Sequence, residues 1–189
     1  MSDPQPFHVD FPFRGSRTYV HSTSIANHWA TRAPDAARFE LVLKGWMTAR
    51  VRFTPAEAPG GTGYVKIGEG DSAQLWRMDE DPAHPVSDRE PFDEAAIPAA
   101  VDTDARRVEV SPLPGATYFD RLIKGNKALI ETVLAPGVPL IAAKIVTAGF
   151  PPDNAPLALA LKSHAGTRIF KSTILRDGSP FGELVFYGD

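Results

Sequence analysis

A proline-rich stretch divides this sequence into two parts of similar length. Residues 81–105 contain a scatter of acidic residues, few large apolar ones, and the prolines Pro82, Pro85, Pro91 and Pro98. Proline lacks a backbone N–H donor and interrupts helices and central strands, so we expect an exposed crossover linker with little regular structure. The chain is therefore predicted to form a first half over residues 1–80 and a second half over residues 106–189.

The second half contains the strongest helix signal in the chain. Apolar residues recur at helical spacing over Tyr118–Leu134, where a buried stripe is expected. A short strand at Arg107–Val110 and the turn Pro112–Gly115 precede this helix. Three or four strands are predicted after it, at Leu140–Phe150, Leu157–Ser163, Thr167–Leu175 and Gly182–Tyr187. Asp177–Gly178 is typical of the hairpin turn that would join the last two.

The first half begins with a short tail, residues 1–11, and continues with a strand and a helix. The run Arg17–Thr23 is rich in residues that favour strands. One of the hydroxyl residues Ser22, Thr23 and Ser24 is expected to cap a helix that follows it. Pro34 limits this helix to about three turns.

Strands complete the first half, so its order of elements resembles that of the second. Apolar and polar residues alternate over Met47–Phe53, which predicts a half-buried strand. Two more strands are predicted at Gly63–Ile67 and Ser72–Met78, joined by a glycine-containing hairpin over residues 68–71. The fold class is accordingly α+β, with one helix and several antiparallel strands in each half.

Composition excludes several classes of function. A hydrophobic content of 43% is sufficient for a core, and the formal net charge of −3 gives no electrostatic reason to expect nucleic acid or an anionic membrane. Cysteine is absent, which excludes disulfides and thiolate chemistry. No apolar run is long enough to span a bilayer, and residues 1–10 do not resemble a secretory signal. We therefore expect a cytoplasmic protein.

A helix wrapped by a long antiparallel sheet, repeated within one chain, resembles the double hot-dog fold. The turn Pro112–Leu113–Pro114–Gly115, placed before a long helix, is similar to the turn that opens the central helix of dehydratase-type hot dogs. The resemblance implies two hot-dog-like halves, each with a helix packed on a curled antiparallel sheet. It also implies an acyl-thioester substrate carried on coenzyme A or acyl carrier protein, and a thioesterase or dehydratase activity.

His21 is the candidate catalytic residue. A dehydratase-type site places a histidine just before the helix, and residues 107–117 contain none, whereas the first half has His21 at the corresponding position. Imidazole can serve as a general base near neutral pH. The alternative is a histidine that ends a strand and bonds to the backbone. An acid of the second helix, Asp120, is the candidate partner, although as a first-turn residue it could simply complement the helix dipole.

Candidate substrate-binding residues lie near both helices. Arg14, Arg17 and Tyr19 could hold the anionic carrier arm through bidentate hydrogen bonds, or could belong to a solvated loop. Asn126 lies among apolar neighbours on the second helix, so it must be paired or face a cavity. On the same helix, Lys127 and Glu131 are expected to form an i, i+4 ion pair.

Two readings of function remain open at this stage. The first is an acyl-thioester hydrolase or a dehydratase or hydratase. We expect no metal and no cofactor, because the five histidines lack metal-ligand spacing and no nucleotide-binding motif is present. The second is a non-catalytic ligand-binding or assembly module with the same fold. A β-barrel ligand carrier is disfavoured by the strong helix in mid-chain. Either of the first two could be a homo-oligomer.

Overall fold

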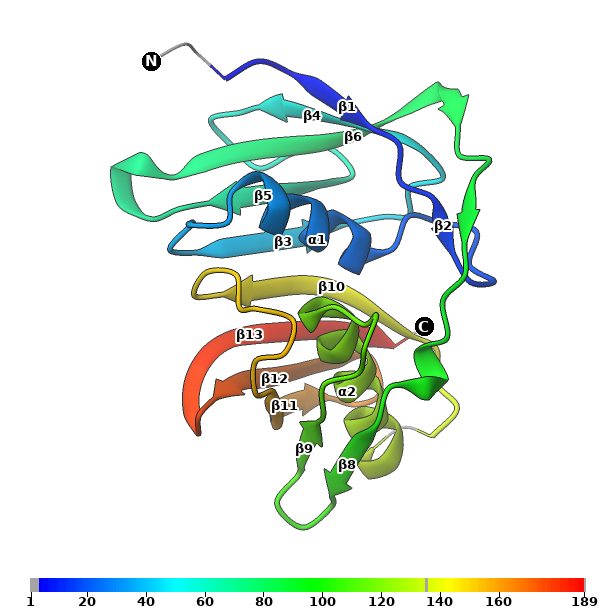
Figure 1. Ribbon diagram of the computed structural model, residues 1–189, viewed down its shortest axis with the longest axis vertical. Helices are drawn as coiled ribbons and strands as arrows, with labels where there is room; N and C mark the ends of the chain where they lie inside the picture. The colour runs from blue at the N-terminus through cyan, green and yellow to red at the C-terminus, as the bar shows by residue number, and fades with distance from the viewer. Residues whose placement is uncertain (1–3, 135, 189) are drawn as a thin grey trace. The chain divides into compact units, whose positions relative to one another are not determined.

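The computed structural model describes residues 4–134 and 136–188, and the chain divides into two compact units (Figure 1). Unit 1 spans Met1–Phe92 and unit 2 spans Asp93–Asp189. The boundary lies inside the predicted crossover, residues 81–105. Within the described residues, no helix is long and apolar enough to cross a membrane.

Unit 1 is built on an antiparallel sheet of five strands. In spatial order these are β1 (Phe7–Val9), β4 (Ala49–Pro55), β6 (Gln74–Pro85), β5 (Gly63–Ile67) and β3 (Phe39–Leu43). The alternation predicted over residues 47–53 is confirmed in β4, where Val51 and Phe53 are buried and Arg52 is exposed. The predicted hairpin between β5 and β6 is also confirmed, and its loop contains the short helix η1 (Gly70–Ser72). β1, by contrast, falls in the segment predicted to be a tail.

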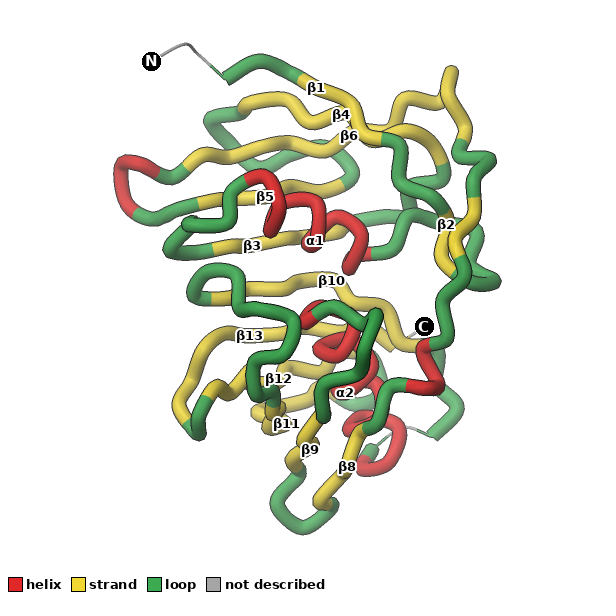
Figure 2. The backbone as a smooth tube through the Cα atoms, viewed as in Figure 1, coloured by secondary structure: helices red, strands yellow, loops and turns green. Residues whose placement is uncertain are grey.

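Helix α1 (Ser22–Arg32) lies along this sheet (Figure 2). It packs on the sheet through aromatic side chains. The ring of Trp29 lies 5.5 Å from that of Phe53 on β4 and 5.5 Å from that of Trp76 on β6. Trp29 is only 2% exposed. The helix ends before Pro34, as predicted.

The entry to α1 differs from the prediction. Residues 17–21 form no strand, and the cap position is held by His21, whose side chain makes no capping hydrogen bond. The strand in this region is instead the two-residue β2 (Phe13–Arg14), which pairs in parallel with β7 (Arg89–Glu90). The hydroxyl of Thr23, one of the predicted caps, bonds to other side chains and is therefore not used to cap the helix.

Unit 2 has its own antiparallel sheet of six strands. Their spatial order is β10 (Leu140–Thr147), β13 (Ser179–Gly188), β12 (Ile169–Arg176), β11 (Ala158–Ala165), β9 (Arg107–Val110) and β8 (Ala99–Asp102). The hairpin predicted at Asp177–Gly178 is confirmed between β12 and β13. Both turn residues have positive φ, +50° and +77°, as a two-residue turn with matching twist requires.

Helix α2 (Tyr118–Val133) packs closely on β9 and β11, because Gly125 has no side chain. A Cβ atom at Gly125 would lie 2.4 Å from Val110 and 3.2 Å from Leu159. Arg121, fully buried in the same helix, donates hydrogen bonds to the carbonyl oxygens of Val110, Asp153 and Ala155. One prediction for this helix was wrong: Lys127 pairs with Glu94 of the short helix η2 (Glu94–Ala96), at 3.0 Å, and not with Glu131.

The segment predicted to be an irregular crossover contains regular structure. β6 continues to Pro85, and β8 and η2 also lie within residues 81–105. Beyond Met78, β6 pairs only with β4, since its pairing with β5 ends there. A strand bonded on one side tolerates proline, because the missing N–H can face the unpaired side. The pairing also shifts register here, since the adjacent residues Ala49 and Arg50 of β4 pair with Pro85 and Asp81, which leaves residues 82–84 of β6 as a bulge.

Candidate functional site

Three polar side chains are buried together where helix α1 begins. Arg14, His21 and Thr23 are 8%, 5% and 0% exposed. The Nη1 atom of Arg14 donates to Thr23 Oγ1 at 2.7 Å, and the same oxygen lies 2.8 Å from His21 Nδ1. Burial of three polar groups costs free energy unless they bond to one another. These hydrogen bonds therefore fix the positions of the three side chains in unit 1.

The pairing of β2 with β7 supplies further support for Arg14. Register places Arg14 opposite Glu90, and the Arg14 Nε atom lies 2.8 Å from a carboxylate oxygen of Glu90. The guanidinium carbon also lies 3.8 Å from the centre of the Phe92 ring, a cation–π distance. Arg14 is thus held from two sides.

The loop between β2 and α1 has a defined shape. Gly15 has φ of +59°, and a Cβ atom there would lie 3.0 Å from the carbonyl oxygen of Phe92. Arg89 of β7 donates to the carbonyl oxygens of Gly15 and Arg17. The loop that carries Arg17 and Tyr19 is consequently fastened to the strand that carries Glu90.

Aromatic rings surround His21. The rings of Tyr19 and Phe92 each lie 6.4 Å from its imidazole. The Tyr19 ring lies 4.1 Å from that of Trp46, tilted by 48°, and Trp46 is 47% exposed. Arg17 lies 5.6 Å from the centre of the Phe92 ring. We refer to the buried trio Arg14, His21 and Thr23 with these surrounding side chains as the His21 cluster.

Sequence reasoning found some members of the His21 cluster and missed others. His21, Arg14, Arg17 and Tyr19 were candidates, and the structure brings them together within unit 1. Glu90 and Phe92 were not predicted from the sequence. They lie about 70 residues further along the chain, in the predicted linker. Thr23 was considered only as a helix cap, and Trp46 was not among the candidate site residues.

The two candidates from the second half lie on α2. Asp120 takes part in a capping box: its carboxylate accepts from the Thr117 N–H, and its own N–H donates to the Thr117 hydroxyl. Its catalytic role remains a prediction. Asn126 is fully buried, and among the residues that the structure describes neither atom of its carboxamide has a hydrogen-bond partner.

A pocket of about 390 Å³ lies in unit 2 beside the turn before α2, lined by residues 112–117, Asp153 and Asn154. The N–H groups of Thr117 and Tyr118 already donate to the carboxylates of Asp120 and Asp153. These first-turn donors are therefore used within the protein, and the pocket does not favour an anion.

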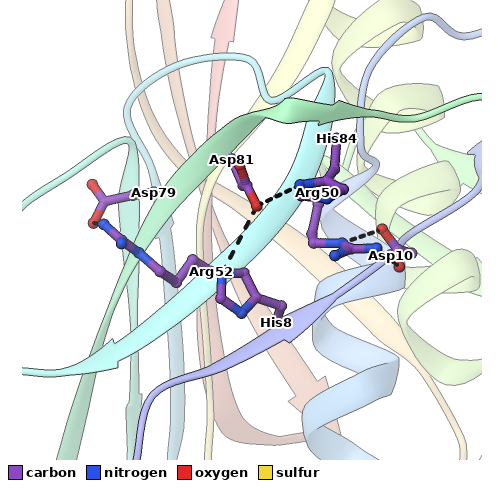
Figure 3. Close-up of polar contacts among 7 residues, drawn as sticks. All are labelled: His8, Asp10, Arg50, Arg52, Asp79, Asp81 and His84. Atoms are coloured by element: carbon purple, nitrogen blue, oxygen red, sulfur yellow. Dashed lines mark hydrogen bonds and ion pairs between the residues drawn. The ribbon is translucent and has the colours of Figure 1, made fainter.

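A second polar cluster joins β1, β4 and β6 on unit 1 (Figure 3). Asp81 lies 2.8 Å from His84 and 4.0 Å from His8, while Arg50 binds Asp10 through two hydrogen bonds of 2.8 and 2.9 Å. No group of three or more histidine or acidic side chains in the described residues has the arrangement needed to hold a metal ion. Arg50 of β4 forms an ion pair with Asp10, which follows β1, whereas Asp81 and His84 both lie on β6 and Asp81 is half-buried.

The polar contacts of this cluster lower the pKa values of two aspartates. Desolvation acts to raise the pKa of Asp81, but the hydrogen bond to His84 and the nearby histidines outweigh it and lower that pKa. The hydrogen bond from Arg50 lowers the pKa of Asp10. Groups with a depressed folded-state pKa stabilise the fold above their unfolded pKa of about 4, and this stabilisation is lost as the pH falls through the folded-state value.

We therefore expect the Asp10→Asn/Asp81→Asn double variant to show a weaker dependence of stability on pH below about pH 4. The free energy of unfolding, measured in urea across this range, should fall less steeply for the double variant than for the parent. Asp71→Asn, at an exposed position in η1, is the matched control and should keep the parent slope. Equal slopes for the parent and the double variant would contradict the assignment.

Comparison with known proteins identifies the fold. No family model matches the sequence, and no curated protein matches it. A protein of unknown function with a hot-dog fold from Alicyclobacillus acidocaldarius is similar in structure, with a TM-score of 0.52 and 8% identity, covering 100% of this chain and 95% of that one.

Two further structures are similar at lower scores. An acyl-ACP thioesterase from Bacteroides thetaiotaomicron has a TM-score of 0.43 and 10% identity, and the match covers 97% of each chain. The dehydratase domain of RzxB from Pseudomonas fluorescens has a TM-score of 0.46 and 10% identity, covering 96% of this chain and 93% of that one. The fold follows from the first comparison: this chain has the hot-dog fold.

Proposed function

We propose that this protein is an enzyme that acts on acyl thioesters of coenzyme A or acyl carrier protein, by hydrolysis or by the addition or removal of water. The observation that carries the proposal is the buried hydrogen-bonded trio Arg14, Thr23 and His21 at the start of a helix in a hot-dog fold. His21 is the proposed catalytic residue. A thioester carbonyl is polarised by a positioned hydrogen-bond donor or attacked with the help of a base, and imidazole can supply either function.

The proposal assigns different tasks to the two arginines. Arg14 is buried, ion-paired with Glu90 and covered by Phe92, so its proposed task is to hold Thr23. Arg17 lies on the loop beside Tyr19, is half-buried and carries a guanidinium suited to phosphate. We assign to Arg17 the binding of the anionic carrier arm, with Tyr19 beside it.

The proposal also extends to architecture. Each unit contains an antiparallel sheet and a helix that packs on it, and we propose that the two units are two hot-dog-like halves, as the order of elements along the sequence predicts. On this view residues 1–80 and 106–189 are the halves, and residues 81–105 connect them. Asp120 and Asn126 on α2 are the proposed contributions of the second half to catalysis and substrate orientation.

A substrate panel tests the function. The parent protein is incubated with acyl-CoA and acyl carrier protein thioesters of several chain lengths, with thiol release as the readout for hydrolysis and enoyl absorbance as the readout for hydration. We expect turnover of at least one member. Binding of an acyl thioester without turnover would replace the proposal by a non-catalytic binding module, and neither binding nor turnover would overturn both.

A further inference from the structure

The hydroxyl of Thr23 lies between two nitrogen atoms, and the number of hydrogens available restricts how the three groups can bond. A threonine hydroxyl has one hydrogen to donate and two lone pairs to accept with. Its oxygen lies 2.7 Å from Arg14 Nη1 and 2.8 Å from His21 Nδ1, and all three side chains are buried.

The direction of the first hydrogen bond is fixed. A guanidinium group stays protonated in proteins and has no acceptor, so Arg14 donates and Thr23 accepts. Glu90 and Phe92 hold the guanidinium in this position, by an ion pair of 2.8 Å and a cation–π contact of 3.8 Å. One lone pair of the Thr23 oxygen is therefore always used.

The direction of the second hydrogen bond follows from the hydroxyl hydrogen. Within the part of the chain that the structure describes, the acceptor within reach of the Thr23 hydroxyl is His21 Nδ1. If Nδ1 carried a hydrogen instead, the Thr23 oxygen would accept two hydrogen bonds and its own hydrogen would be buried without an acceptor, which is unfavourable. The same objection applies to a protonated imidazolium, which carries hydrogen on both nitrogens.

We infer that Thr23, oriented by Arg14, is a positioning residue that holds His21 as the neutral tautomer with its hydrogen on Nε2. His21 then acts by donating a hydrogen bond from Nε2, and not by accepting a proton. This step rests on the proposed function: during turnover, the group that accepts the hydrogen bond from Nε2 is the carbonyl oxygen of the acyl thioester. Negative charge that develops on this oxygen is stabilised by the donor without any proton transfer to or from His21.

Nitrogen-15 NMR of histidine side chains in the full chain tests the inference without any substrate. At neutral pH the His21 signals, assigned by their loss in His21→Asn, should show a hydrogen-bearing Nε2 and an unprotonated Nδ1. Thr23→Val removes the hydroxyl at nearly constant volume and should shift His21 toward a mixture of tautomers, whereas Thr23→Ser should retain the parent spectrum. A hydrogen on Nδ1 in the parent, or no change in Thr23→Val, would overturn the inference.

Kinetics provide the second arm. Because Thr23 acts through His21, Thr23→Val should lower kcat by about 10-fold or more with little change in KM, and Thr23→Ser should restore it. If the parent turns over no thioester, the proposed function fails, while the tautomer in the parent spectrum still decides the inference about Thr23. If Thr23→Val does not fold, the parent and Thr23→Ser spectra decide it.

Discussion

Replacing His21 by alanine is expected to slow the turnover of an acyl thioester by roughly 10²–10³-fold, the usual cost of removing one positioned hydrogen-bond donor. The physical reason is the fixed position of the imidazole, which Thr23 and the surrounding rings hold in place. The substitution also removes the acceptor for the Thr23 hydroxyl, which costs about 1–3 kcal/mol of stability. His21→Asn is therefore the better companion variant, because its carboxamide can keep an acceptor near the Nδ1 position while lacking Nε2.

The rate and the melting temperature must be read together. We expect both variants to lose activity, and His21→Asn to melt within a few degrees of the parent. His164→Ala is the control, since His164 is exposed on β11, and it should change neither quantity. Full activity in His21→Asn would remove His21 from the mechanism.

Truncation of Trp29 to alanine is expected to lower the free energy of unfolding by about 3–5 kcal/mol. Trp29 is 2% exposed, and its ring packs on Phe53 and Trp76 and lies 5.9 Å from that of Phe7. The substitution leaves a cavity at the centre of the packing between α1 and its sheet. For a chain of this size the loss corresponds to a fall in melting temperature of roughly 6–20 °C.

Trp46 offers a matched comparison for this experiment. Its side chain is 47% exposed, so Trp46→Ala should change the free energy of unfolding by less than about 1 kcal/mol. Urea unfolding of both variants, monitored by circular dichroism, separates the two cases. Equal destabilisation by the two substitutions would show that the packing of α1 on its sheet is not the main source of stability in unit 1.

The sequence was informative where an element is long or its turn chemistry is strict. The stripe of α2, the alternation in β4 and the Asp177–Gly178 turn were all predicted, because each follows from local periodicity or from the conformations that particular residues allow. The short strands β1 and β2 were not predicted, since two or three residues form a strand only when a partner far along the chain pairs with them.

The same distinction explains the candidate site. His21 and its neighbouring arginines stood out as residue types that can do chemistry. The role of Thr23 depends on Arg14, and the position of Arg14 depends on the pairing of β2 with β7. That pairing joins residues 76 positions apart in the sequence, for example Phe13 and Arg89. No local pattern indicates such a contact, and a threonine at the start of a helix more commonly serves as a cap.

The unpaired carboxamide of Asn126 has a consequence for how the stability of this protein can change. An apolar side chain of similar size, such as leucine, would remove a buried polar group that lacks partners, so a single substitution could make unit 2 more stable. A chain selected for thermal robustness alone would gain from that exchange. The free energy of unfolding of unit 2 is thus lower than the same packing could reach, and the amide of Asn126 is the group whose replacement is expected to raise it.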